Sequence, residues 1–254
     1  MTSPLANTVA LVTGASSGIG AATALKLASL GATVALVARR QDRLKEIATS
    51  IREAGGQAIV VEADITGKEQ AAGAVAQVVS VLGRLDILIN CAGLMLIGNT
   101  VGADISDWDK MVQININGLL YTTHAALPHL LKAAESGPRK VADLVNVSSV
   151  GAFQVNPINN VYTMTKVGVN GFSESLRQEV TKRHVRVGVI EPGSVSTELA
   201  SHNKPEVVEK ILAPFFSEIE TLEPEDIADA IAYMVTRPRR AAVAKLWVGP
   251  TEQA

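Results

Sequence analysis

The 254-residue chain has little cysteine, little histidine and few aromatic residues. Cys91 is its only cysteine, which excludes an intramolecular disulfide and a cysteine-rich metal site. His124, His129, His184 and His202 do not fall at metal-ligand spacing, so we expect no metal site. Aromatic residues make up 4% of the chain, whereas alanine, valine, leucine and glycine are plentiful. This composition is typical of helices packed closely against a sheet.

A concentration of charge and a long apolar run are also missing. The formal net charge is −2, which gives no basic surface for nucleic acid or for an anionic membrane. No apolar run approaches the roughly 18 residues of a membrane span. The first Lys or Arg is Lys26, so the amino-terminal stretch lacks the positive flank of a secretory signal. We therefore expect no nucleic-acid partner, no membrane partner and a cytoplasmic location.

Short apolar runs alternate with longer amphipathic stretches along the whole chain, and no linker or internal repeat divides it. Strands are predicted at 9–13, 33–38, 58–62, 85–90, 141–148, 185–191 and 245–248, and helices at 19–30, 41–54, 67–82, 108–131, 162–183 and 224–236. Strands that are apolar on both faces and separated by helices indicate a parallel sheet covered on both sides. The sequence predicts a single α/β domain over residues 1–254: a doubly wound Rossmann fold with a seven-stranded parallel sheet flanked by helices on both faces.

A glycine-rich turn, G-x-x-x-G-x-G over residues 14–20, joins the first predicted strand to the first helix. Glycines permit a tight turn and a close approach of the backbone to a pyrophosphate, which the N–H groups of the helix N-terminus then bind. The spacing differs from the common G-x-G-x-x-G pattern. A plain strand-to-helix turn is the alternative, but the position after the first strand favours a dinucleotide site.

The end of the second strand indicates which dinucleotide is bound. An acidic residue at this point would bind the ribose 2′-hydroxyl of NAD, but Arg39 and Arg40 stand there instead. Guanidinium groups bind a 2′-phosphate with paired, charged hydrogen bonds. The sequence therefore favours NADP(H) over NAD(H). The alternative is that both arginines begin a solvated helix.

Four polar side chains indicate the chemistry. Tyr162 and Lys166 are four residues apart on one face of a predicted helix, where an ammonium would lower the pKa of the phenol. Ser149 ends the fifth strand, where its hydroxyl can polarise a substrate carbonyl. Asn115 lies within an apolar helix. Taken alone, the Tyr-Lys spacing occurs by chance in many helices, and Asn115 can be a satisfied buried amide.

Together these motifs resemble the classical short-chain dehydrogenase/reductase family over nearly the whole chain. Ser149 stands thirteen residues before Tyr162, which is the family's usual spacing. The motifs follow the family's order: residues 13–20, Asp64, residues 90–93, Asn115, Ser149, Tyr162 with Lys166, and Pro192-Gly193. One departure is Cys91, which replaces the second asparagine of the Asn-Asn-Ala-Gly version and leaves Asn90 and the glycine intact.

The resemblance implies a role for each of these residues. Tyr162 would be the general acid and base, and Lys166 would lower its pKa and hold the nicotinamide ribose. Ser149 would orient the substrate oxygen, and Asn115 would position a water. Asn90 would flank the ribose with Gly93. The implied cofactor contacts are Gly14, Ser16, Ser17, Ile19, Gly20, Arg39, Arg40, Asp64, Ile65, Asn90, Ala92, Gly93, Tyr162, Lys166, Pro192, Gly193, Val195 and Thr197.

Three functions remain open at this stage. The first is an NADP(H)-dependent carbonyl reductase or alcohol dehydrogenase. The second is a non-redox relative such as an epimerase or dehydratase, which the short chain and the glycine spacing disfavour. The third is a catalytically silent NADP-binding sensor or scaffold, which would not need all four polar side chains. The resemblance also implies a homotetramer or homodimer built on helices 108–131 and 162–183.

The substrate is expected to be a small-molecule carbonyl or alcohol: a small or medium ketone, an aldehyde or a hydroxy acid. The chain is most similar to bacterial NADP-dependent reductases of the 3-hydroxy-acid and clavulanate-aldehyde type. Residues 94–97, 151–161 and 198–216 are expected to form the pocket walls, with a substrate lid at about 196–218. No arginine pair stands out to bind a carboxylate, which leaves His202 and Lys204.

Overall fold

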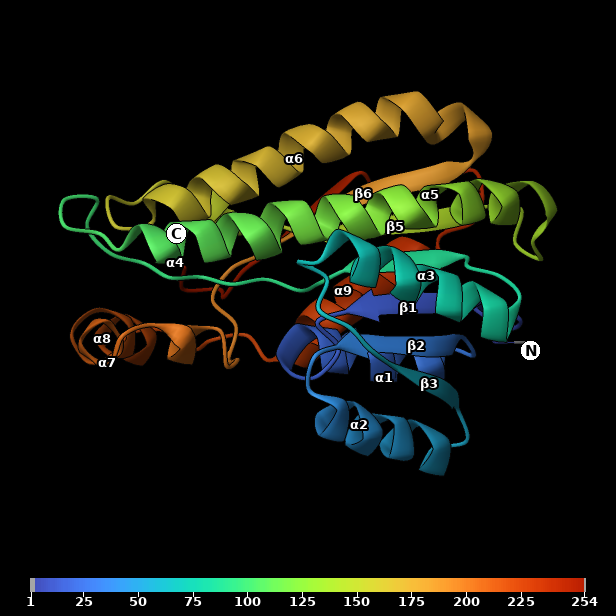
Figure 1. Ribbon diagram of the computed structural model, residues 1–254, viewed down its shortest axis with the longest axis horizontal. Helices are drawn as coiled ribbons and strands as arrows, with labels where there is room; N and C mark the ends of the chain where they lie inside the picture. The colour runs from blue at the N-terminus through green and yellow to red at the C-terminus, as the bar shows by residue number, and fades with distance from the viewer. Residues whose placement is uncertain (1–2, 254) are drawn as a thin grey trace.

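Seven strands pair in one parallel sheet in the computed structural model, which describes residues 3–253 (Figure 1). They are β1 (Val9–Thr13), β2 (Thr33–Ala38), β3 (Gln57–Glu62), β4 (Ile87–Asn90), β5 (Ala142–Val147), β6 (Val185–Pro192) and β7 (Lys245–Val248). Their order is β3-β2-β1-β4-β5-β6-β7, and every pairing is parallel. Every residue of β1, β4, β5 and β6 is buried, as their largely apolar sequences predict. The predicted fold class is confirmed.

Helices cover both faces of the sheet (Figure 1). On one face α1 (Gly18–Ser29), α2 (Gln41–Glu53) and α9 (Pro224–Thr236) enclose one apolar core. On the other face α3 (Lys68–Leu82), α5 (Leu119–Ser136) and α6 (Asn160–Val180) enclose a second. No helix in the described part of the chain has both the length and the apolar character to cross a membrane.

The helix predicted at 108–131 differs from the prediction. It begins earlier, as α4 (Ile105–Val112), because the Asp104 side chain accepts a hydrogen bond from the Ser106 N–H at 2.9 Å and caps it. A π-helical turn, Gln113–Gly118, then separates α4 from α5. Such turns are rare and often occur at functional sites. This one contains Asn115.

The segment predicted as a lid, residues 196–218, keeps that name below; it contains short helices that project beyond the carboxyl ends of the strands (Figure 1). They are η4 (Ala200–His202), α7 (Pro205–Val207), η5 (Val208–Leu212) and α8 (Ala213–Ser217). Strand order reverses at β1, between β2 and β4. Ligands of doubly wound sheets bind at the carboxyl ends of the strands at such a reversal, and the lid lies at that edge.

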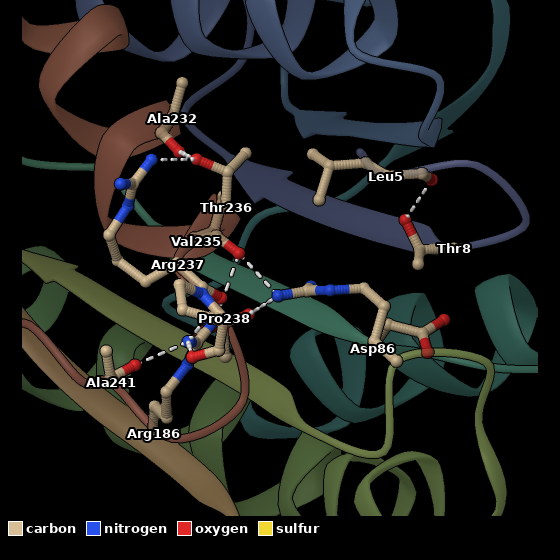
Figure 2. Close-up of polar contacts among 12 residues, drawn as sticks. Leu5, Thr8, Asp86, Arg186, Ala232, Val235, Thr236, Arg237, Pro238 and Ala241 are labelled. Atoms are coloured by element: carbon tan, nitrogen blue, oxygen red, sulfur yellow. Dashed lines mark hydrogen bonds and ion pairs between the residues drawn. The ribbon is translucent and has the colours of Figure 1, made fainter. Parts of the chain in front are cut away.

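The opposite edge, at the amino ends of the strands, is closed by buried ion pairs. Arg186 at the start of β6 is 8% exposed and donates to Asp143 of β5 at 2.7 Å. The same guanidinium donates to the carbonyl of Val235 in the last turn of α9 and to those of Arg237 and Ala241 after it (Figure 2). Backbone groups left unpaired at the helix end are thus satisfied by a side chain from the sheet.

Candidate active site

A cavity of about 790 Å³ opens at the carboxyl edge of the sheet and extends from the glycine-rich turn to the lid. Its volume lies within the range of cofactor and substrate sites. Of the residues predicted for the site, all but Asn90 and Asn115 line this cavity. The sequence motifs, which are spread from residue 14 to residue 197, are therefore brought together around one cavity.

The floor of the cavity beside β1 lacks side chains for a steric reason. Gly14 has φ +67°, and a Cβ there would lie 2.8 Å from the backbone of Ala92. A Cβ on Gly20 would overlap the carbonyl oxygen of Gly14. The Thr13 hydroxyl accepts hydrogen bonds from the N–H groups of Cys91 and Ala92 at 3.1 and 3.2 Å, so the turn and the segment after β4 are held together. Backbone is exposed at this floor, as close binding of a pyrophosphate requires.

Arg40 lies at the same end of the cavity. Its guanidinium donates to the hydroxyls of Ser16, at 3.1 Å, and Ser17, at 2.8 Å. It also forms an ion pair with Glu198 of the lid segment at 2.9 Å. Arg39 is exposed and lines the cavity. The predicted 2′-phosphate contacts therefore share this end with a carboxylate that the sequence analysis did not single out.

Asp64 follows β3 and faces this end of the cavity. Burial opposes its ionisation, but hydrogen bonds from Thr66 and the charge of Arg39 outweigh burial and lower the pKa of Asp64. The Thr66 hydroxyl and N–H donate to one carboxylate oxygen at 2.7 and 3.0 Å. Asp64 is thus held ionised in a fixed orientation.

Tyr162, Lys166 and Ser149 lie at the other end. Tyr162 and Lys166 are in the first turns of α6 and are 6% and 5% exposed. The Lys166 Nζ lies 5.6 Å from the centre of the Tyr162 ring and donates to the Val147 carbonyl at 2.9 Å. The Ser149 hydroxyl accepts the Gly151 N–H at 3.0 Å and is hydrogen-bonded to Tyr162. All three side chains face the cavity.

The pKa of Tyr162 shifts in the direction opposite to the sequence-based prediction. Burial raises the pKa of the phenol, and the hydrogen bond with Ser149 opposes this only in part. Burial also lowers the pKa of Lys166 to about 8. The ammonium is directed at the Val147 carbonyl and does not offset the burial of the phenol. In the protein alone, Tyr162 therefore keeps its proton at neutral pH.

Asn115 does not line the cavity, because its side chain is used to hold the backbone. Its Oδ1 accepts the Leu94 N–H at 2.8 Å, and its Nδ2 donates to the Leu94 carbonyl at 2.8 Å and the Thr165 hydroxyl at 3.1 Å. Of the two interpretations of Asn115, the structure shows the satisfied buried amide. The amide fixes the segment after β4 against α6.

Asn90 is also directed away from the cavity, which differs from its predicted place beside the ribose. Its Nδ2 donates to Thr123 of α5 and to Asn146 of β5, both at 2.9 Å. Asn146 in turn donates to Ser173 of α6 at 2.8 Å. This buried network joins two strands to the helices that flank the site. Turn chemistry alone does not tell on which side of a strand such an amide lies.

Asn203 and Gln253 were not predicted from the sequence. Asn203 is buried; it accepts the Ile97 N–H at 2.8 Å and donates to the Met95 carbonyl at 3.0 Å. It therefore joins the lid to the segment after β4. Gln253 lines the cavity and accepts the Ser194 N–H at 2.9 Å. Both residues lie in segments without strong periodicity, so no sequence pattern marks them.

The described residues do not support metal-dependent chemistry or a cysteine nucleophile. Within residues 3–253 no group of three or more His, Cys, Asp or Glu side chains is placed to hold a metal ion. Burial raises the pKa of the Cys91 thiol to about 12, although the charge of Lys166 opposes this shift. A thiol with such a pKa is not an activated nucleophile.

Comparisons with known proteins agree with this geometry. The model of the short chain dehydrogenase family matches residues 8–207. An uncharacterized oxidoreductase of Staphylococcus aureus (strain MRSA252) is 35% identical, with 97% of this chain and 98% of the relative covered. An uncharacterized oxidoreductase of Staphylococcus epidermidis is also 35% identical, with 95% and 96% covered.

Solved structures show the same likeness. The closed form of a serine dehydrogenase complexed with NADP+ superposes with a TM-score of 0.88 and 28% identity, with 97% of this chain and 96% of that chain covered. A metagenomic short-chain oxidoreductase in complex with NADP gives a TM-score of 0.80 and 31% identity, with 98% and 100% covered. The family model, the curated relatives and the shared fold lead to one conclusion: the chain belongs to the short-chain dehydrogenase family.

Proposed function

We propose that this protein is an NADP(H)-dependent oxidoreductase that transfers a hydride reversibly between nicotinamide and a carbonyl or secondary alcohol. The observation that carries the proposal is a single cavity with Arg39 and Arg40 at one end and Ser149, Tyr162 and Lys166 at the other. The first pair suits a 2′-phosphate, and the second set suits acid–base chemistry on an oxygen.

The residues of the cavity fit a dinucleotide. The backbone floor at Gly14 and Gly20 would accept the pyrophosphate, and Asp64 would hydrogen-bond the adenine end. Arg39 and Arg40 would bind the 2′-phosphate, a group that the acidic residue of NAD sites would repel. When bound, NADPH supplies the hydride, and NADP+ accepts it in the reverse direction.

Ser149 and Tyr162 would act on the substrate oxygen. The Ser149 hydroxyl would donate to the carbonyl oxygen and stabilise the charge that develops on it. Because burial keeps Tyr162 protonated, its phenol is ready to give a proton to the nascent alkoxide. In oxidation the same oxygen would take the alcohol proton. Lys166 would stabilise the phenolate that remains and hold the ribose hydroxyls.

Asn115 would serve as a positioning residue. Its hydrogen bonds fix the backbone of Leu94, which lines the cavity, against the start of α6. The π-helical turn that contains Asn115 interrupts the regular hydrogen bonding of the helix beside the catalytic side chains. A water in the proton relay would therefore be held by backbone groups here, because the amide is already paired.

The cytoplasmic location and the assembly remain predictions. We propose a homodimer or homotetramer in which α5 and α6 pack against their copies. Met164 and Val167 of α6 support this proposal, because they are apolar and about half exposed, at 55% and 48%. Sedimentation at several protein concentrations tests it.

The test of function is turnover of a panel of ketones and aldehydes with NADPH and NADH in parallel. We expect NADPH to be preferred, and Tyr162→Phe to reduce kcat by about a thousandfold because the general acid is lost. Tyr233→Phe is the matched control, since Tyr233 is on α9 and does not line the cavity. If NADPH binds but nothing turns over, and Tyr162→Phe behaves like the parent, the silent-binder or non-redox alternative replaces the proposal.

A further inference from the structure

We infer, on the basis of the proposed function, that the substrate is a neutral carbonyl compound with an apolar substituent, and that anionic carbonyl compounds are discriminated against. The inference rests on what lines the part of the cavity between Tyr162 and the lid. Apolar side chains reach it from the segment after β4 and from the lid. Apolar members are Met95, Ile97, Ile211, Leu212, Phe215 and Phe216.

The cationic side chains of the cavity lie away from this apolar region or are already paired. Among the described residues that line it, the cations besides histidine are Arg39, Arg40 and Lys166. The two arginines lie at the end with Ser16 and Asp64, and Arg40 is paired with Glu198. Lys166 is directed at the Val147 carbonyl. None of them is free to pair with a substrate carboxylate beside the lid.

Two further residues were expected to be able to bind a carboxylate. Lys204 does not line the cavity, and His202 lines it from an exposed position on the lid. Glu198 of the same segment is paired with Arg40 at the other end of the cavity and brings no cation here. A carboxylate brought among the apolar side chains would lose its hydration without gaining a buried ion pair, which is costly. The balance of charge therefore favours a neutral ligand.

The polar groups that remain are neutral amides. Gln154, Asn156 and Asn159 line the cavity from the loop between β5 and α6. Amides donate and accept hydrogen bonds without a charge, so they suit a second oxygen of an ester, amide or ketone. The apolar side chains would take the remainder of the molecule.

The two walls are already joined in the protein without ligand. The Asn203 side chain binds the backbone of Met95 and Ile97 and also donates to Ala200 within the lid at 3.0 Å. The position of the lid over the apolar region is therefore fixed by hydrogen bonds within the protein. It is held by a buried amide with three hydrogen bonds.

The experiment compares an ester with its free acid, so that the reacting ketone is the same. With NADPH, we expect kcat/KM for butyl 3-oxobutanoate to exceed that for 3-oxobutanoate at least about tenfold. Ile211→Ala and Phe215→Ala should lower kcat/KM for the ester about fivefold or more and leave the acid unchanged. Val155→Ala is the control, because Val155 is exposed and apolar but does not line the cavity.

Binding is measured separately from turnover. The thermal midpoint of the protein saturated with NADP+ is recorded with butyl 3-hydroxybutanoate and with 3-hydroxybutanoate. A larger shift with the ester and no hydride transfer would support the substrate class and refute the reductase. Equal or larger effects of the acid in either assay, or no shift with the ester, overturn the substrate class. Turnover of the acid that His202→Ala abolishes would overturn it too, by identifying the imidazole as the carboxylate partner.

Discussion

The two edges of the sheet carry buried polar groups in very different states. At the amino edge, Asp143 is paired with both Arg139 and Arg186. Arg186 is further bound to carbonyls near the end of α9 (Figure 2). At the carboxyl edge, Tyr162 and Lys166 are equally buried, but each faces a cavity and has few partners within the protein. The amino edge closes the fold, and the carboxyl edge leaves groups free to act on a ligand.

The pKa values express the same difference. Burial dominates at the carboxyl edge, where it raises the pKa of Tyr162 and lowers that of Lys166 to about 8. At the amino edge, hydrogen bonds from Arg84 fix Asp86, and those bonds raise the pKa of Arg84. Paired charges therefore stabilise one edge, while unpaired groups with shifted pKa values mark the other as the site of chemistry.

The largest expected effect tests whether the amino edge serves stability alone. Arg186→Ala removes one of the two cationic partners of Asp143 and takes the guanidinium donor away from the carbonyls of Arg237 and Ala241, so it should lower the free energy of unfolding by about 3–5 kcal/mol. Urea unfolding measures this, and kcat of the folded fraction should not change. Arg183→Ala, which breaks an exposed pair with Glu135, is the control and should cost about 0–1 kcal/mol. A loss of kcat in Arg186→Ala without a loss of stability would contradict the comparison.

The pH profile tests the carboxyl edge. Because burial lowers the pKa of Lys166, its ammonium is lost as the pH rises through about 8, whereas the raised pKa of Tyr162 keeps the phenol protonated there. We therefore expect kcat/KM for carbonyl reduction to be level below about pH 8 and then to fall about tenfold per pH unit. Measurement of kcat/KM for reduction from pH 6 to 10 tests this expectation. An increase with pH in the reductive direction would mean that phenolate is the active form.

A glycine tests how tightly the catalytic side chains are placed. A Cβ on Gly151 would lie 3.3 Å from both the Ser149 Oγ and the Tyr162 ring. Gly151→Ala should therefore displace them and lower kcat about tenfold, with little change in the urea midpoint. Gly98→Ala is the control, since a Cβ on Gly98 meets nothing within 4 Å. Equal kcat values for the two variants would show that the site tolerates this displacement.

The smallest expected effect concerns Glu198. Glu198→Gln removes the carboxylate that competes with a 2′-phosphate for Arg40, so the Kd for NADPH should fall about two- to fivefold. The Kd for NADH, which lacks that phosphate, should not change. Fluorescence titration at low and high salt measures both, with Glu135→Gln as the control at a remote pair. Weaker NADPH binding would show that Glu198 orders Arg40 for the cofactor instead of competing with it.

Much of the fold followed from the pattern of apolar residues. Continuous apolar runs separated by helices specify a parallel sheet, and the helix at Pro224–Thr236 and the strand at Lys245–Val248 occur as predicted. The π-helical turn at Gln113–Gly118 could not be predicted in this way, because its residues continue the apolar stripe of the helix. The Asp104 cap starts the helix at Ile105, three residues before the predicted start at 108.

The site was predicted to the extent that its residues follow strand ends. Arg39, Asp64 and Ser149 line the cavity for that reason, and Tyr162 lines it from the start of the helix that follows β5. The side-chain directions of Asn90 and Asn115 depend on tertiary partners, which a motif does not contain. The same applies to Arg186, one of two charged residues in the buried strand β6.

The Asn203 contact has a consequence for how such a pocket can be altered. Met95 and Asn203 are 108 residues apart in the chain, yet one side chain determines how their segments fit. An exchange of the lid alone between relatives would separate an acceptor from its donor, and so would an exchange of the segment after β4 alone. The two segments therefore have to be exchanged together. We expect chimaeras that take both from one relative to change substrate selectivity and to keep this contact.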